Sequence, residues 1–144
     1  MLKTVAILED DSRRVGEMRA CLGETSPRIE SIFFESADEI IAWLGEHLAE
    51  VALISLDHDL PLRQRDGHLF DCGTGREVAD FLACLVPTCP IIVHSSNEHF
   101  APGMVFALRE AGWQVGRVYP NDDLAWVRRD WVQNVLGYLR HRDS

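Results

Sequence analysis

Acidic and imidazole side chains stand directly after two apolar runs of this 144-residue sequence. Glu9 and Asp10 follow the first run, and the triplet Asp-His-Asp at 57–59 follows the other. A carboxylate at the end of an apolar strand is rarely buried unless it is paired or bound to a metal. Mg²⁺ commonly takes one or two carboxylates together with water and phosphate oxygens. The pattern therefore predicts a site for Mg²⁺ or Mn²⁺ with these ligands: Glu9, Asp10, Asp57 and Asp59. Taken alone, the acidic run at 9–11 is more typical of a solvated turn or a helix N-terminus, and the metal site is favoured only once Asp57 is considered with it.

The histidines near these carboxylates could add acid–base chemistry. An Asp carboxylate is a known covalent nucleophile for phosphoryl groups, and a divalent cation stabilises charge on the transferred oxygens. Opening a cyclic phosphate also requires a base and an acid, and an imidazole can serve as either near neutral pH. His58, beside Asp57, and His94, at the end of a later apolar run, are the candidates. The alternative for His94 is a hydrogen-bonded core residue, because strand alternation places it and Ser95 on opposite faces.

Apolar runs with the character of β-strands alternate with amphipathic segments that predict helices. The expected strands cover 5–8, 29–34, 51–56, 91–93 and 114–119. The expected helices lie around 15–22, after a capping box at Ser36 and Glu39, over 76–85, over 104–111, and after a cap at Asp123. This alternation predicts a parallel sheet covered on both faces, with the ligand crevice at the carboxyl ends of its strands. The polar clusters should therefore meet at one edge.

The remaining irregular stretch, 62–73, lies between the third strand and the third helix. Its Asp66-Gly67 dipeptide is typical of a hairpin turn. Such a hairpin would emerge beside the acidic cluster, where it could act as a flap over a ligand. A tolerated surface insertion explains the stretch equally well.

Length and charge limit the classes of function. The chain suffices for one domain, expected over 1–144, and it carries a net charge of −9. That charge argues against broad contact with DNA or an anionic membrane, because such binding needs clustered Lys and Arg. No apolar run is long enough to span a bilayer, and the four cysteines show no metal-ligand spacing. We expect a cytoplasmic protein with reduced thiols; a homodimer is compatible with the pattern but not required by it.

Four motifs, in this order, resemble those of a receiver domain, the phosphoacceptor module of two-component signalling. They read AILEDDSR, ALISLDHDLP, PIIVHSS and AGWQVGRVYP. The resemblance implies an α/β, doubly wound, flavodoxin-like parallel sheet with strand order 2-1-3-4-5. It also implies that Glu9 and Asp10 help to hold Mg²⁺, that Asp57 is both metal ligand and nucleophile, and that Ser95 binds a phosphate oxygen.

The sequence departs from the ordinary receiver pattern in three ways. Tyr119 replaces the lysine that precedes the proline of the last motif, and the stretch 62–73 is additional. His58, His94 and Asn97 add polar groups at the expected site. These additions are similar to a divergent branch of receivers, the cyclic-phosphate-processing receiver domains.

Several residues are candidates to bind phosphate in place of the missing lysine. Asn97, next to Ser95 and Ser96, could join the amides before the fourth helix in a small anion nest, although Asn97 is equally typical of a turn or cap. Arg13 is the best-placed cation, directly after the acidic turn, with Arg14 and Arg117 as alternatives.

Three functions fit these residues. The first is a receiver-like domain that binds Mg²⁺ and accepts a phosphoryl group on Asp57 from a histidine kinase or a small phosphodonor. The second is a metal-dependent phosphohydrolase that processes cyclic or terminal phosphates of a small substrate with the same carboxylates plus His58 and His94. The third is a degenerate binding module without catalysis.

Overall fold

The computed structural model describes residues 2–143 and is built around a five-stranded parallel sheet. The order β2-β1-β3-β6-β7 confirms the predicted doubly wound topology, since these are the five expected strands with a short hairpin inserted after the third. The strands are β1 (Lys3–Leu8), β2 (Ile29–Phe34), β3 (Val51–Leu56), β6 (Ile91–His94) and β7 (Val115–Val118). The three central strands are apolar and buried along most of their length because helices cover both faces of the sheet.

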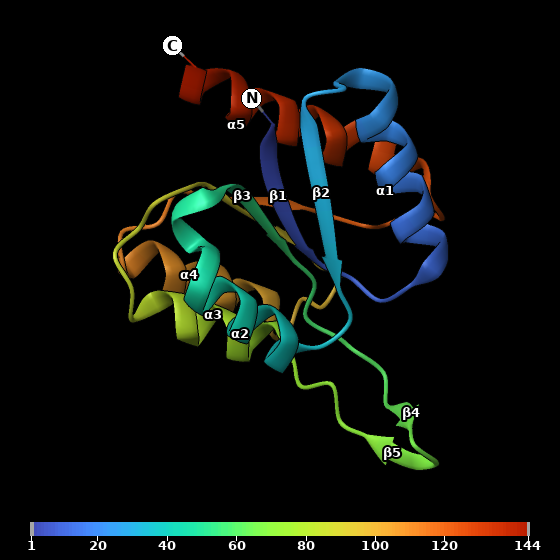
Figure 1. Ribbon diagram of the computed structural model, residues 1–144. Helices are drawn as coiled ribbons and strands as arrows, with labels where there is room; N and C mark the ends of the chain where they lie inside the picture. The colour runs from blue at the N-terminus through green and yellow to red at the C-terminus, as the bar shows by residue number, and fades with distance from the viewer. Residues whose placement is uncertain (1, 144) are drawn as a thin grey trace.

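Helices cover the sheet in two groups (Figure 1). One face packs against α2 (Ala37–His47), α3 (Gly75–Ala83) and α4 (Ala101–Glu110), and a short 3₁₀ turn, η1 (Leu48–Glu50), follows α2. The other face packs against α1 (Ser12–Thr25) and the last helix, which consists of the π-helical segment η2 (Val127–Trp131) and α5 (Val132–Asp143). Each face thus has its own apolar core.

Side-chain caps fix the start of the helices nearest the sheet edge. Asp11 accepts hydrogen bonds from the backbone amides of Arg13 and Arg14 and begins α1. Ser36 caps α2 as predicted, accepting a bond from the Glu39 amide. These caps set the direction in which the first side chains of each helix leave the edge of the sheet.

The predicted cap of the last helix is wrong by one residue. Asp122, not Asp123, accepts the bond from the backbone amide of Trp126. The side chain of Asp123 instead binds Arg13. The helix then widens into the five-residue π segment η2. Such a widened turn rotates the side chains that follow it and is frequent at functional sites.

The predicted hairpin forms between β4 (Arg63–Arg65) and β5 (His68–Phe70). Asp66 and Gly67 at its turn have φ values of 53° and 79°, as a tight two-residue turn requires. The hairpin projects away from the body of the molecule below the carboxyl edge of the sheet (Figure 1). Its role as a flap stays a prediction.

All four cysteines are free, and three of them are buried. In the part of the chain that the structure describes, no helix has the length and apolar character that crossing a bilayer would demand.

Candidate metal and phosphate site

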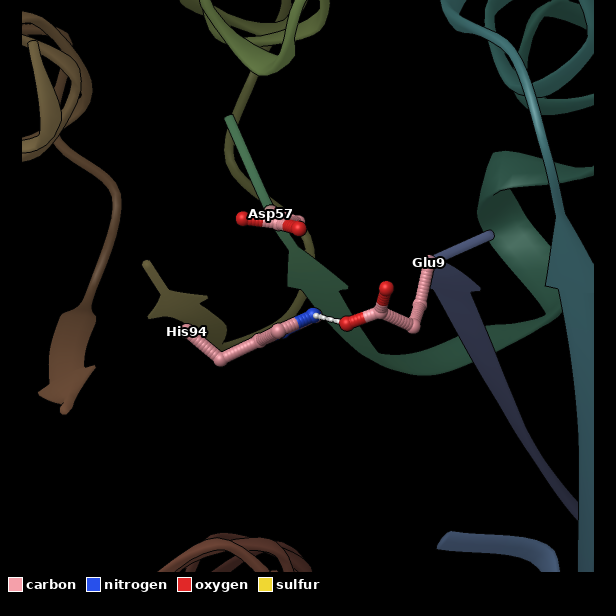
Figure 2. Close-up of side chains that lie close together, drawn as sticks. All are labelled: Glu9, Asp57 and His94. Carbon is pink, nitrogen blue, oxygen red and sulfur yellow. Dashed lines mark ion pairs between the residues drawn. The ribbon is translucent and has the colours of Figure 1, made fainter. Parts of the chain in front are cut away.

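The carboxyl ends of β1, β3 and β6 bring together the side chains of Glu9, Asp57 and His94. Each of the three offers one ligand atom, these atoms all lie within 4.8 Å of one another, and all three side chains are buried. Figure 2 shows the imidazole of His94 and the carboxylate of Glu9 directed toward each other, with the carboxylate of Asp57 beside them. The three strands are neighbours in the sheet, so the cluster follows from the topology.

Glu9 is held by four contacts. Its Oε2 accepts hydrogen bonds from the backbone amides of Asp10 and Asp11, both 3.1 Å long. Its Oε1 lies 3.3 Å from His94 Nε2 and 3.4 Å from Arg14 Nη1. Burial alone would raise the pKa of Glu9, but His94, the Asp11 amide and Arg14 outweigh burial and leave this pKa below its ordinary value. Glu9 is therefore a buried carboxylate that stays ionised.

The negative charge of Asp57 is less well compensated than that of Glu9. Its Oδ1 accepts a 2.7 Å hydrogen bond from the amide of His58, and its Oδ2 lies 3.7 Å from Arg14 Nη1. Burial, with a smaller contribution from the nearby charge of Glu9, raises the pKa of Asp57 to about 6, although His94, the His58 amide and Arg14 oppose the change. A divalent cation would favour the ionised form of this carboxyl group.

His94 is fixed from behind by a buried hydrogen-bond chain. Trp131 Nε1 donates to Ser55 Oγ over 2.9 Å, and Ser55 Oγ lies 2.6 Å from His94 Nδ1. The ring of Trp126 stacks against the imidazole at 6.1 Å between centroids. At the front, His94 Nε2 is buried and has no well-aligned hydrogen-bond partner among the described residues, although it lies near Glu9. A buried nitrogen of this kind, aimed at two carboxylates, fits a metal ligand.

Beside the cluster lies an open hollow of about 370 Å³. It is large enough for a phosphate group and the atoms attached to it. Arg14 is the one cation among the residues that line this hollow. The other lining residues are Glu9, Asp10, Asp11, Asp57, Asp59, Pro61 and Ser96. The hollow is therefore strongly acidic, and a metal ion is the natural counter-charge.

Residues 5–110 match the model of a family described as the cyclic-phosphate processing receiver domain. The chain belongs to this family. The match covers β1 to α4 and so includes all three residues of the cluster. Among curated proteins, none matches the sequence significantly.

Solved receiver structures show the same fold at low sequence identity. The phosphorylated cyanobacterial phytochrome response regulator RcpA is 17% identical, with 96% of this chain and 95% of that chain covered and a TM-score of 0.72. A CheY-like receiver domain protein from Methanospirillum hungatei JF-1 is 18% identical, with coverages of 99% and 98% and a TM-score of 0.70. The Mn²⁺-bound form of response regulator Rcp1 is 19% identical, with coverages of 94% and 93% and a TM-score of 0.62.

The other two predicted metal ligands of this receiver domain lie outside the cluster of three. Asp10 is turned toward the hairpin, where Arg63 Nη2 binds its backbone oxygen at 3.0 Å and approaches its Oδ2 at 3.5 Å. Asp59 is held by the Asn97 amide at 3.1 Å and by His58 Nδ1 at 2.9 Å. Both carboxylates still line the hollow, so they remain in reach of a bound ligand or its water shell.

His58 does not face the cluster. Its ring stacks on Phe100 at 4.7 Å between centroids, nearly parallel, and its Nδ1 contacts Asp59. The structure thus places His58 behind Asp59, where it can orient that carboxylate. Of the two predicted catalytic histidines, His94 is the one in the cluster.

The predicted phosphate-binding residues after β6 form a compact turn. Ser95 is buried and its Oγ accepts a 3.1 Å bond from the Asn97 amide. Asn97 Oδ1 accepts bonds from the amides of His99 and Phe100, which is the cap-like alternative considered for this residue. Ser96 lines the hollow.

The cation predicted first, Arg13, points elsewhere: its Nη2 binds Asp123 at 2.7 Å. Arg117 is also engaged, donating to the Ser95 carbonyl at 2.8 Å and lying over the ring of Tyr119 at 4.4 Å. Arg14, one residue after Arg13, reaches the cluster instead.

Three residues of the site were not predicted from the sequence: Ser55, Trp126 and Trp131. Ser55 is the single polar residue of β3, and a lone hydroxyl in a buried strand does signal a hydrogen-bonding requirement. In the sequence the two tryptophans indicate only the apolar face of a helix, because no local pattern shows which indole ring contacts His94.

A divalent cation fits the donor set, which offers two carboxylates and one imidazole on adjacent strands. Imidazole is a common ligand of transition metals, whereas Mg²⁺ prefers oxygen ligands. The donor set therefore supports the prediction of a divalent cation and makes no choice between Mg²⁺ and Mn²⁺.

Proposed function

We propose that this receiver domain binds a divalent cation through Glu9, Asp57 and His94 and hydrolyses a cyclic phosphodiester to a phosphomonoester. The observation that carries the proposal is the convergence of these three buried donors, within 4.8 Å of one another, beside an open hollow. The receiver pattern implies carboxylate ligands alone and does not account for the imidazole donor of His94. The description of the matched family, cyclic-phosphate processing, names the same chemistry.

A bound divalent cation would withdraw charge from a phosphate oxygen and lower the pKa of water. The protein's contribution is to hold the donors in place. The Ser55 hydroxyl and the Trp131 indole support the imidazole of His94, while two backbone amides fix Glu9. Pre-positioned donors of this kind need little reorganisation when the reaction begins.

Asp59 is the group best placed to move a proton. Its carboxylate is 69% exposed, lines the hollow, and is oriented by Asn97 and His58. In the hydrolysis, the oxygen of water forms a bond to phosphorus and one ester P–O bond of the ring breaks. The proton lost by water passes to Asp59 and then to the departing alkoxide oxygen, so water is added across the broken bond.

Acceptance of a phosphoryl group on Asp57 is the second candidate. It is favoured by the position of Asp57 at the end of β3 and of Ser95 just after β6, at one edge of a receiver fold. A histidine kinase or a small phosphodonor would supply the group. Tyr119 stands where the receiver pattern has a lysine, and its ring lies against Arg117, so the ion pair expected to hold a phosphorylated aspartate is missing.

The two candidates differ in their products. Metal-stripped protein, reloaded with Mn²⁺ or Mg²⁺, is offered a 2′,3′-cyclic nucleotide and, separately, acetyl phosphate. Hydrolysis is expected with metal, with loss of turnover in His94→Asn and a large decrease in Asp59→Asn. Arg128→Gln, which removes an exposed cation paired with Glu17 and Glu24 of α1, should keep wild-type rates. A phosphoryl adduct on Asp57, detected by mass spectrometry without turnover of the cyclic nucleotide, would favour the second candidate. Neither product, together with no metal binding, would contradict both.

A further inference from the structure

Arg14 occupies a position that the proposed metal ion would need. Its Nη1 lies 3.4 Å from Glu9 Oε1 and 3.7 Å from Asp57 Oδ2. These two carboxylates also belong to the metal-donor cluster. The guanidinium is therefore the counter-ion of both carboxylates in this structure, and it offsets the repulsion between two buried negative charges.

The guanidinium of Arg14 lies at the edge of the hollow. Its carbon lies 5.3 Å from the centroid of the Trp126 ring, and its side chain is 24% exposed. The backbone amide of Arg14 is fixed by the Asp11 cap. The base of the side chain is thus fixed, while the charged end borders the hollow, where a ligand could reach it.

A phosphate group entering this hollow would meet no other cation among the lining residues. Arg63 is engaged with Asp10 and Glu35, and Arg117 is engaged with the Ser95 carbonyl and Glu98. The remaining lining charges are all carboxylates, which repel an anion. A phosphate in this hollow would therefore need a second positive group, besides a metal ion, to offset these carboxylates.

We propose, resting on the function proposed above, that Arg14 exchanges partners. It neutralises Glu9 and Asp57 while no metal is bound, and once a divalent cation displaces it, it donates hydrogen bonds to the phosphate oxygens of the ligand. A guanidinium presents paired N–H donors whose geometry matches phosphate oxygens. Arg14 thereby supplies the positive charge that a lysine provides in the receiver pattern and that Tyr119 does not carry. Arg14 thus competes with the metal ion for Glu9 and Asp57 and, once displaced, helps to bind the phosphate.

This dual role predicts effects of opposite sign in one variant. Calorimetric titration measures Mn²⁺ affinity first, and then the affinity for inorganic phosphate at saturating Mn²⁺. In Arg14→Gln, Mn²⁺ should bind severalfold more tightly because a competing cation is gone, while phosphate should bind at least about tenfold more weakly. Arg14→Lys should keep part of the phosphate affinity. Arg128→Gln, which also removes one positive charge but outside the hollow, should change neither.

Two results would contradict the exchange of partners by Arg14 while leaving the proposed function standing. The first is wild-type phosphate affinity in Arg14→Gln together with reduced affinity in Arg13→Gln. The second is weaker Mn²⁺ binding in both Arg14→Gln and Arg14→Lys with unchanged phosphate binding, because a merely structural arginine would behave in this way. Absence of Mn²⁺ binding by the wild-type protein would instead contradict the proposed function itself, and the exchange with it. Thermal melting of each variant verifies that it is folded.

Discussion

Replacing Asp57 by Asn should make the metal-free protein more stable at neutral pH. Asp57 is buried beside another carboxylate, and its pKa is raised from 3.8 to about 6. A carboxyl group whose pKa is higher in the folded state than in the unfolded state binds more protons when folded. Its ionisation therefore costs stability, and the loss develops as the pH rises from about 4 to about 6.

The size of the effect follows from the pKa change. A difference of about 2 pH units corresponds to about 3 kcal/mol of destabilisation above pH 6. Asn removes the charge and can still accept the 2.7 Å bond from the His58 amide through its oxygen. It gives up the 3.7 Å contact with Arg14, which offsets part of the gain. We expect Asp57→Asn to be more stable than wild type by about 1 to 3 kcal/mol at pH 7, and to be equal to it at pH 4.

Urea denaturation in EDTA at pH 4, 5, 6 and 7 measures this difference. Glu110→Gln serves as the control, because it also replaces a carboxylate by an amide but at an exposed position at the end of α4. Addition of Mn²⁺ should reverse the order, since a cation that binds only the folded protein stabilises wild type but has lost a ligand in Asp57→Asn. The reasoning is refuted if Asp57→Asn is less stable than wild type at pH 7 and both proteins show the same pH profile.

Three further predictions concern the surroundings of the cluster. Ser55→Ala should weaken Mn²⁺ binding by roughly 10- to 100-fold in calorimetric titration, because His94 loses the partner of its Nδ1, and Ser55→Thr should restore part of the affinity. Gly75→Ala should destabilise the protein by about 3 kcal/mol or more in urea denaturation, because the added Cβ would lie 1.9 Å from the Asp57 carbonyl oxygen. Wild-type stability of this variant would contradict the close approach of the start of α3 to Asp57. Mn²⁺ should quench tryptophan fluorescence, and Trp126→Phe should remove most of that change, since this ring stacks against His94.

The sheet and the location of the site could be predicted because both depend on local pattern and on topology. Each central strand is mostly apolar, and parallel strands carry their carboxyl ends to one edge. This was enough to place Glu9 and Asp57 together. The Asp66-Gly67 turn likewise identified the hairpin, since few dipeptides adopt its backbone angles.

The orientation of side chains at the edge could not be predicted in the same way. Arg13 and Arg14 are adjacent on a helix and therefore point in directions about 100° apart, so the position of the Asp11 cap decided which one reaches the site. Asp10 is drawn away by Arg63, a residue of the hairpin that is distant in sequence. These choices depend on tertiary contacts rather than on spacing.

His94 illustrates the same limit. Its chemistry made it a candidate site residue, and strand alternation made it a candidate core residue. The structure gives it both roles, since Nδ1 contacts the buried Ser55 and Nε2 faces Glu9. The π-helical turn that brings Trp131 to Ser55 has no signature in the sequence. The support behind the imidazole therefore became visible only in three dimensions.

Pulsed electron paramagnetic resonance of the Mn²⁺-loaded protein tests the central claim most directly, because it detects nitrogen bound to the metal. We expect hyperfine coupling from one imidazole nitrogen in the wild-type protein and loss of that coupling in His94→Asn. Mn²⁺ bound without any nitrogen coupling, or with a coupling that survives in His94→Asn, would contradict the assignment of Glu9, Asp57 and His94 as the metal site.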